Sequence, residues 1–151
     1  MPILQQREQE IVRQRFETEL KRNVSITLFT QRNIGGLFIP GRECASCGPA
    51  EQMLDEVSAL SPKISVEVVD FFGNPQEAKD RGVEKIPAII VSSKGEDNVR
   101  FFGLPAGFEF AVLLDTIVSA SANKSSLQLE TRRRLRRLSE EAHIQVFVTP
   151  N

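Results

Sequence analysis

The order of apolar patterns along the chain limits its fold more than any other feature of the sequence. Short runs of β-branched and aromatic residues, typical of strands, alternate with stretches in which apolar residues recur every three or four positions, typical of helices. From residue 24 onwards the predicted order is strand, helix, strand, helix, strand, strand, helix. A strand-helix-strand unit followed by two antiparallel strands and a helix predicts an α/β domain built on one mixed sheet.

The predicted strands are short and apolar, and turn-forming residues separate them. They are Val24–Thr30, Ile64–Phe72, Ile86–Val91 and Val99–Phe102. A helix is expected ahead of them within residues 5–22, where apolar residues recur every four positions. The remaining helices are expected directly after Cys47, between Asn74 and Gly82, and around Phe110–Ile117.

The chain divides into one main domain and a short C-terminal part. We expect the domain over residues 1–122, a linker at residues 123–126, and a further helix and strand within residues 127–151. The linker is predicted from its small polar residues, which form neither a helical stripe nor an apolar run.

The C-terminal part repeats the opening of the chain. Leu135 and Leu138 belong to a predicted buried helical stripe, and the run Ile144–Val148 is typical of a strand. Residues 142–149 match residues 23–30 in the order of helix end, polar turn and apolar strand. The sequence therefore predicts the start of a second unit, in a chain that is a fragment of a longer protein.

Charge and hydropathy exclude two classes of partner. The chain has 19 Lys and Arg residues against 20 Asp and Glu residues, so its formal net charge of -1 argues against attraction to nucleic acid. The basic run Arg132–Arg137 is flanked by glutamates, which favours a solvated helix face. No apolar run is long enough to cross a membrane and no export signal precedes the domain. We expect a cytoplasmic protein without nucleic-acid or membrane contacts.

The pair Cys44 and Cys47 carries the only distinctive chemistry. The pair has the spacing Cys-Ala-Ser-Cys and lies between a predicted strand and an amphipathic helix. Two cysteines are too few for the disulfide framework of a secreted protein, so this spacing indicates redox or metal chemistry. Zinc normally takes four ligands, and His143 is the sole histidine, so no metal site is expected within one chain. A metal or cluster shared between two chains stays open, as does a purely structural role for two buried cysteines.

Disulfide exchange requires a thiolate that attacks and a second thiol that releases the mixed disulfide, and it requires no cofactor. If the helix begins at the pair, Cys44 lies at its N-terminus, where free N–H groups and the helix dipole favour a thiolate. Cys47 then lies one turn inside and is less exposed. We expect Cys44 to be the nucleophile and Cys47 the resolving thiol.

Three segments together resemble a known family. The Cys-x-x-Cys pair after a strand, the sequence Lys85-Ile86-Pro87-Ala88 before a strand, and the segment Phe102–Phe110 resemble the first half of archaeal-type protein disulfide oxidoreductases. Those glutaredoxin-like proteins carry two tandem thioredoxin folds. The N-terminal domain of the flavoprotein subunit of alkyl hydroperoxide reductase, an electron-transfer module, is similar. The resemblance implies a thioredoxin fold here, with a second thioredoxin-like module to follow.

The resemblance also implies a substrate-binding element and a set of partners. Pro87 is expected to follow a cis peptide bond and to face the cysteines, and the backbone of Ile86 to pair with an extended substrate. The implied partners are protein thiols or disulfides and an upstream reductase. Two features depart from the family: the segment Ile34–Arg42 is inserted before the cysteines, and Glu43 occupies the position where many thioredoxins have Trp.

Besides a metal or cluster shared between two chains, one other function remains open from the sequence. Tandem folds of this type can keep one half inactive, so the unit could be a redox-silent scaffold that binds peptide or docks the second module. The insertion is either a flap that contacts protein substrates or the partner module, or a loop that packs on its own domain.

Overall fold

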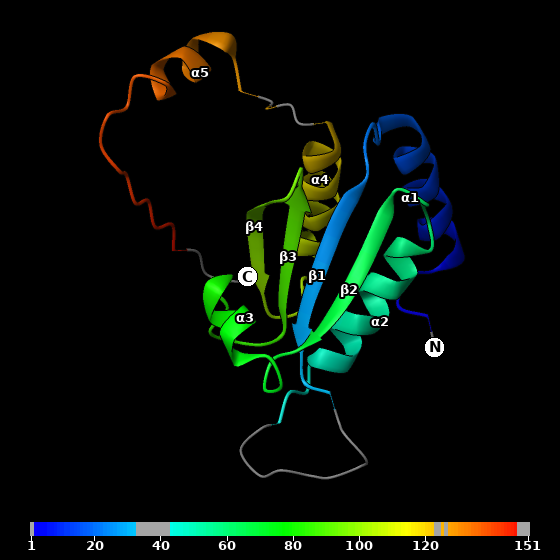
Figure 1. Cartoon of the computed structure of the whole chain (residues 1–151). Helices are drawn as coiled ribbons and strands as arrows, with labels where there is room; N and C mark the ends of the chain where they lie inside the picture. Colours follow the sequence, from blue (N-terminus) through cyan, green and yellow to red (C-terminus); the bar gives the residue numbers. More distant parts are fainter. Residues whose placement is uncertain (1, 33–42, 123–124, 126, 148–151) are drawn as a thin grey trace.

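Figure 1 shows a computed structural model of the chain, which describes residues 2–32, 43–122, 125 and 127–147. The elements in chain order are α1 (Gln6–Glu19), β1 (Val24–Thr30), α2 (Cys47–Ser58), β2 (Ile64–Asp70), α3 (Pro75–Asp80), β3 (Ala88–Ser93), β4 (Glu96–Phe102), α4 (Phe108–Ala122) and α5 (Leu129–Leu135). Among the described residues, no helix has the length and apolar character needed to cross a bilayer.

The four strands form one mixed sheet in the order β2-β1-β3-β4. Strand β1 pairs in parallel with β2, with Val24 opposite Ile64, and antiparallel with β3, with Phe29 opposite Ala88. Strands β3 and β4 form an antiparallel hairpin. The predicted element order, the mixed sheet and the thioredoxin fold with an additional N-terminal helix are confirmed.

Helices cover both faces of the sheet (Figure 1). On one face, Val24, Ile26 and Leu28 of β1 pack in a core cluster with residues of α1, α2 and α4. On the other face, Phe29 packs with Ala78 of α3 and with Ile90. Because adjacent residues of a strand point to opposite faces, a strand covered on both sides is buried throughout, as β3 is.

The hairpin between β3 and β4 turns at Lys94 and Gly95, whose φ angles are 55° and 80°. Two consecutive residues with positive φ form the two-residue turn that matches the twist of antiparallel strands. Strand β4 therefore begins at Glu96, before the predicted start at Val99. The apolar pattern missed this beginning because Glu96 and Asp97 are polar.

The side chain of Arg81, at the C-terminal end of α3, forms hydrogen bonds with strands β4 and β1. Its Nε and Nη2 donate to the two carboxylate oxygens of Asp97 on β4 at 2.8 and 2.9 Å, and its Nη1 donates to Thr27 Oγ1 on β1 at 3.1 Å. Ser92 Oγ also donates to Asp97, at 2.6 Å. The hydrogen bonds from Arg81 are the main cause that lowers the pKa of Asp97 from its usual value of 3.8.

The C-terminal part differs from its prediction in two respects. Helix α5 has no buried residue, and Leu135 and Leu138 are 49% and 62% exposed, so the predicted buried stripe is wrong. Residues 141–147 contain no strand, so the strand expected at Ile144–Val148 is not formed over residues 144–147, and Val148 lies outside the described residues. No described strand pairs with this segment, and an unpaired segment gains no ladder hydrogen bonds. Figure 1 shows α5 apart from the sheet. The second unit and the linker at residues 123–126 stay predictions.

Replacing Asp97 with Asn removes the negative charge that Arg81 faces. We expect Asp97→Asn to lower the free energy of unfolding at pH 7 by about 1 to 3 kcal/mol, the range for hydrogen bonds to charged groups. The pKa of Asp97 is depressed in the folded state, so its contribution is complete above the unfolded pKa and is lost as pH falls through the folded pKa. Urea unfolding from pH 7 downwards should show the difference from wild type shrinking in acid.

The control is Asp115→Asn. Asp115 pairs with Arg15 across α1 and α4, but its side chain is 65% exposed, whereas that of Asp97 is 24% exposed. We expect this variant to lose less than about 0.5 kcal/mol. Equal losses in the two variants, or a loss at Asp97 that does not change with pH, would contradict the role given to the Arg81 contact.

Thr27 and Thr30 of β1 allow a second comparison between two variants. Both are buried, but Thr27 Oγ1 accepts a hydrogen bond from Arg81, whereas Thr30 Oγ1 has no partner in the described part of the chain. A buried unpaired hydroxyl costs about 1 to 3 kcal/mol. Thr30→Val should therefore raise the free energy of unfolding by about 1 kcal/mol, and Thr27→Val should lower it. Chemical denaturation measures both, and destabilisation by Thr30→Val would show that its hydroxyl has a partner in the folded protein.

Candidate redox site

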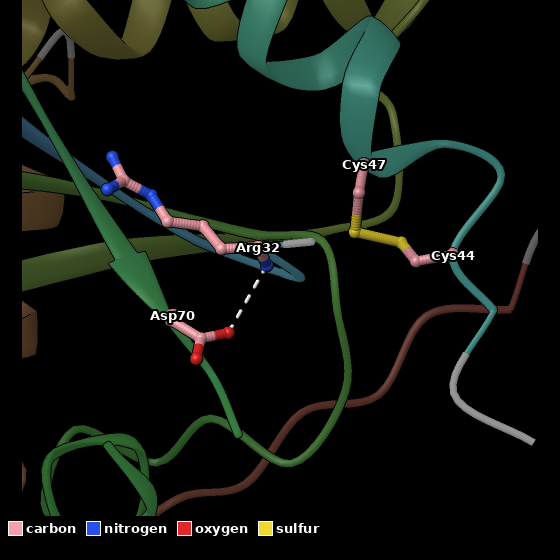
Figure 2. Close-up of a disulfide and its surroundings, with 4 residues drawn as sticks. All are labelled: Arg32, Cys44, Cys47 and Asp70. Atoms are coloured by element: carbon pink, nitrogen blue, oxygen red, sulfur yellow. Dashed lines mark hydrogen bonds between the residues drawn. A yellow bond between two sulfur atoms is a disulfide. The ribbon is translucent and has the colours of Figure 1, made fainter. Parts of the chain in front are cut away.

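The two cysteines form a disulfide at the start of α2 (Figure 2). Their Cα atoms are 5.4 Å apart. The helix begins at Cys47, and Cys44 lies in the turn that precedes it, where its carbonyl accepts a hydrogen bond from the Cys47 N–H at 3.3 Å. We expected Cys44 at the helix terminus itself and Cys47 one turn inside. In the structure Ser46 is the N-cap, so the helix begins at Cys47, three residues later than expected, and Cys44 lies before it.

The two sulfur-bearing residues differ in exposure. Cys47 is 3% exposed and belongs to the buried face of α2, whereas Cys44 is half-buried. The first turn of α2 carries no acidic residue. Its Gly48 N–H has no hydrogen-bond partner among the described residues, and Pro49 has no N–H. The terminus thus presents a free donor and the positive end of the helix dipole beside the disulfide, which favours a thiolate there.

The disulfide faces a cavity of about 350 Å³. Its lining comes from the end of β1, the turn and the first turns of α2, and consists of Gln31, Arg32, Cys44, Cys47, Gly48 and Glu51. Three of these residues, Gln31, Arg32 and Glu51, have polar or charged side chains, so the approach to the disulfide is hydrophilic. Sequence reasoning missed Glu51 because its position is unremarkable on an amphipathic helix.

A hydrogen bond joins the ends of β1 and β2 beside this cavity. The Arg32 N–H donates to Asp70 Oδ1 at 3.2 Å, and the Arg32 side chain extends away from the disulfide (Figure 2). Gly73 lies so close to Asp70 that an added Cβ would come within 2.6 Å of Asp70 Oδ2. Neither Arg32 nor Asp70 was singled out from the sequence, where only the Gly-Asn-Pro turn after Asp70 hinted at a fixed backbone.

The Ile86–Pro87 peptide bond is cis, as the resemblance implies. Because Ala88 pairs with Phe29, Pro87 lies at the edge of the sheet where β1 ends and the chain turns towards the cysteines. The Pro87 carbonyl accepts the Gly103 N–H at 2.8 Å, whereas neither backbone group of Ile86 has a hydrogen-bond partner among the described residues. The lining of the disulfide cavity does not include Ile86 or Pro87.

Three further features from the sequence concern the surroundings of the cysteines: the inserted segment, a metal site and Glu43. The inserted segment Ile34–Arg42 lies outside the described residues. Among the residues that are described, no three His, Cys, Asp or Glu side chains gather as metal ligands would. Glu43 is exposed and precedes Cys44.

Two of the solved structures that resemble this chain are an alkylhydroperoxide reductase protein and a protein disulfide oxidoreductase. The alkylhydroperoxide reductase protein AhpF from Enterococcus faecalis has a TM-score of 0.73 and 17% identity, with 89% of this chain and 61% of that chain covered. A protein disulfide oxidoreductase from Aeropyrum pernix has a TM-score of 0.73 and 20% identity, with 89% and 55% covered. At these identities the likeness supports the fold.

Comparison with curated sequences identifies two relatives, and no family model matches the chain. One is the NADH dehydrogenase of Bacillus subtilis, 26% identical over 98 residues, which are 64% of this chain and 17% of that protein. The other is the thioredoxin of Methanocaldococcus jannaschii, 30% identical over 63 residues, which are 41% of this chain and 69% of that protein. With most of a thioredoxin matched in sequence, the same fold, a Cys-x-x-Cys disulfide before α2 and a cis proline before β3, the chain belongs to the thioredoxin family.

Proposed function

We propose that this chain is a thiol/disulfide oxidoreductase module that acts on protein thiols or disulfides. The observation that carries the proposal is the Cys44–Cys47 disulfide at the start of α2, with one half-buried and one buried residue. A dithiol that closes to a disulfide delivers two electrons and two protons to its substrate, and the reverse reaction oxidises a substrate dithiol. The scaffold and shared-metal alternatives have no comparable observation in their support.

The difference in exposure supports different roles for the two thiols. Attack on a protein disulfide needs an approachable sulfur, and Cys44 is the more exposed of the pair. The free N–H at the start of α2 stabilises its thiolate. Cys47 then attacks the mixed disulfide from within, which reforms the Cys44–Cys47 bond and releases the substrate. Cys44 is thus the proposed nucleophile and Cys47 the proposed resolving thiol.

Ile86 and Pro87 are the proposed substrate-binding residues. The N–H and the carbonyl of Ile86 lack partners among the described residues and lie at the same sheet edge as the end of β1. An extended segment of a protein substrate can satisfy both groups as an added strand would. Backbone pairing recognises the extended shape rather than particular side chains.

The partners are proposed from the chain's partial coverage of its relatives. It spans 17% of the curated Bacillus protein and 61% of the Enterococcus structure. We propose that the module passes electrons between an upstream reductase and a second thioredoxin-like module, and that it works in the cytoplasm, where thiols are kept reduced. The balanced net charge of -1 fits protein partners rather than nucleic acid.

Serine substitutions test the redox proposal. We expect both Cys44→Ser and Cys47→Ser to lose turnover in an insulin reduction assay with a small dithiol as the electron donor, because neither variant can close the disulfide. Thermal unfolding of the reduced proteins checks that both variants are folded. Turnover that survives in both variants would leave the scaffold as the better explanation.

The two roles differ in what each variant traps. In Cys47→Ser the mixed disulfide with a substrate cannot be resolved, so a covalent adduct on Cys44 should accumulate and appear in the intact mass. Cys44→Ser should form little adduct, because Cys47 is buried. The reverse pattern, with adducts on Cys47, would exchange the two roles.

A further inference from the structure

The resolving step requires a group that accepts the proton of the Cys47 thiol. Only a thiolate attacks a disulfide, so Cys47 has to lose its proton while the substrate is bound to Cys44. Cys47 is 3% exposed, and a covalently attached substrate covers the adjacent surface further. Bulk water therefore has poor access, and a side chain in the disulfide cavity is better placed to take the proton.

The cavity contains one side chain of the required kind. Of the residues that line it, Gln31 has no basic group near neutral pH, and the guanidinium of Arg32 stays protonated. Among the described residues of this lining, Glu51 is the only one with a carboxylate. Glu51 is half-buried, and its carboxylate has no hydrogen-bond or ion-pair partner among the described residues. A carboxylate that no described residue engages, beside two cysteines, can accept a proton.

The helix sets the approach of Glu51 to Cys47. The two residues are four positions apart in α2, and side chains at that spacing lie on one helix face. Helical side chains also lean towards the N-terminus, so Glu51 leans back over the first turn, where Cys47 lies. The cavity confirms this placement, because both residues line it.

The other charged groups around the cavity are less suitable. Glu43 precedes Cys44 and is exposed, and it does not line the cavity. Asp70 accepts the Arg32 N–H and does not line the cavity either. Figure 2 shows the Arg32 side chain directed away from the disulfide, and no described cation forms an ion pair with Glu51.

We propose that Glu51 accepts the proton of Cys47 in the resolving step, an inference that rests on the redox function proposed above. The Cys47 thiol gives its proton to the Glu51 carboxylate, and the thiolate attacks Cys44 Sγ. The Cys44–substrate disulfide breaks, the Cys44–Cys47 disulfide forms, and the substrate leaves as a thiolate. The protonated Glu51 then returns its proton to that thiolate or to water. In the oxidising direction the same group delivers the proton to Cys47.

The test separates the two thiols with an aromatic disulfide as substrate. The reduced chain reacts with dithiobis(nitrobenzoate) in two steps, and each step releases one coloured thionitrobenzoate: the first when Cys44 attacks, the second when Cys47 resolves. This leaving group is stable as an anion, so the second step reports loss of the Cys47 proton. Glu51→Gln should slow the second step by about 100-fold, the lower end of general base effects. It should leave the first step within about threefold, because a half-buried charge acts only weakly on the neighbouring thiol.

Two comparisons identify a proton-transfer role. Glu43→Gln removes the same charge beside Cys44 and should leave the second step unchanged. In Glu51→Ala, added acetate or formate should restore the second step in proportion to its concentration.

The outcomes distinguish this inference from the proposal on which it rests. A fast second step in Glu51→Gln, or equal slowing by Glu43→Gln, overturns the role of Glu51 while the redox function stands. A wild-type chain that releases only one thionitrobenzoate, or none, overturns both. Circular dichroism of each variant checks that the fold is unchanged.

Discussion

The central strand β1 is the constraint on which the rest of the structure depends. It pairs on one side with β2 and on the other with β3, and helices cover both of its faces. Its side chains between Ile26 and Phe29 are almost fully buried, so a shift of register would expose them and break two strand ladders together. The end of β1 is therefore fixed, and the redox site is built around that end.

Three separate segments meet at this edge of the sheet. The chain that leaves β1 is held by the hydrogen bond from Arg32 to Asp70 at the end of β2. The cis peptide bond before Pro87 leads into β3 beside the same edge. Helix α2 packs its apolar stripe on the sheet and brings Cys47 to the edge. The proposed function uses this arrangement, because a substrate held at Ile86 and Pro87 would lie at the end of the sheet where the disulfide lies.

The asymmetry of the cysteine pair follows from the position of α2. Because the buried stripe of the helix starts at Cys47, that thiol is enclosed, and Cys44 in the preceding turn is left accessible. An enclosed thiol cannot exchange its proton freely with water, and this makes the carboxylate of Glu51 in the shared cavity significant. In the proposed mechanism, the packing that stabilises the helix thus separates the tasks of attack and resolution.

Sequence patterns predicted the parts of the molecule that depend on burial. The apolar runs of β1 to β3 and the stripe of α2 were recognised because their side chains pack in the core. The start of β4 was missed because a tight turn, not burial, determines it, and the stripe through Leu135 and Leu138 was wrong because no described element covers it. In the site, Cys44, Cys47 and Pro87 were recognised because they belong to sequence motifs. Asp70 and Glu51 were not, because Asp70 acts on Arg32, which is distant in sequence, and Glu51 matters only through Cys47, one helical turn away.

The most direct test of this account measures the reactivity of each cysteine in the reduced chain. Brief treatment with iodoacetamide, followed by peptide mass spectrometry, gives separate alkylation rates for Cys44 and Cys47. The account predicts that Cys44 reacts at least about tenfold faster, because it is the more exposed of the two thiols and lies beside the N-terminus of α2. Equal rates, or faster alkylation of Cys47, would contradict the division of roles on which the proposed mechanism depends.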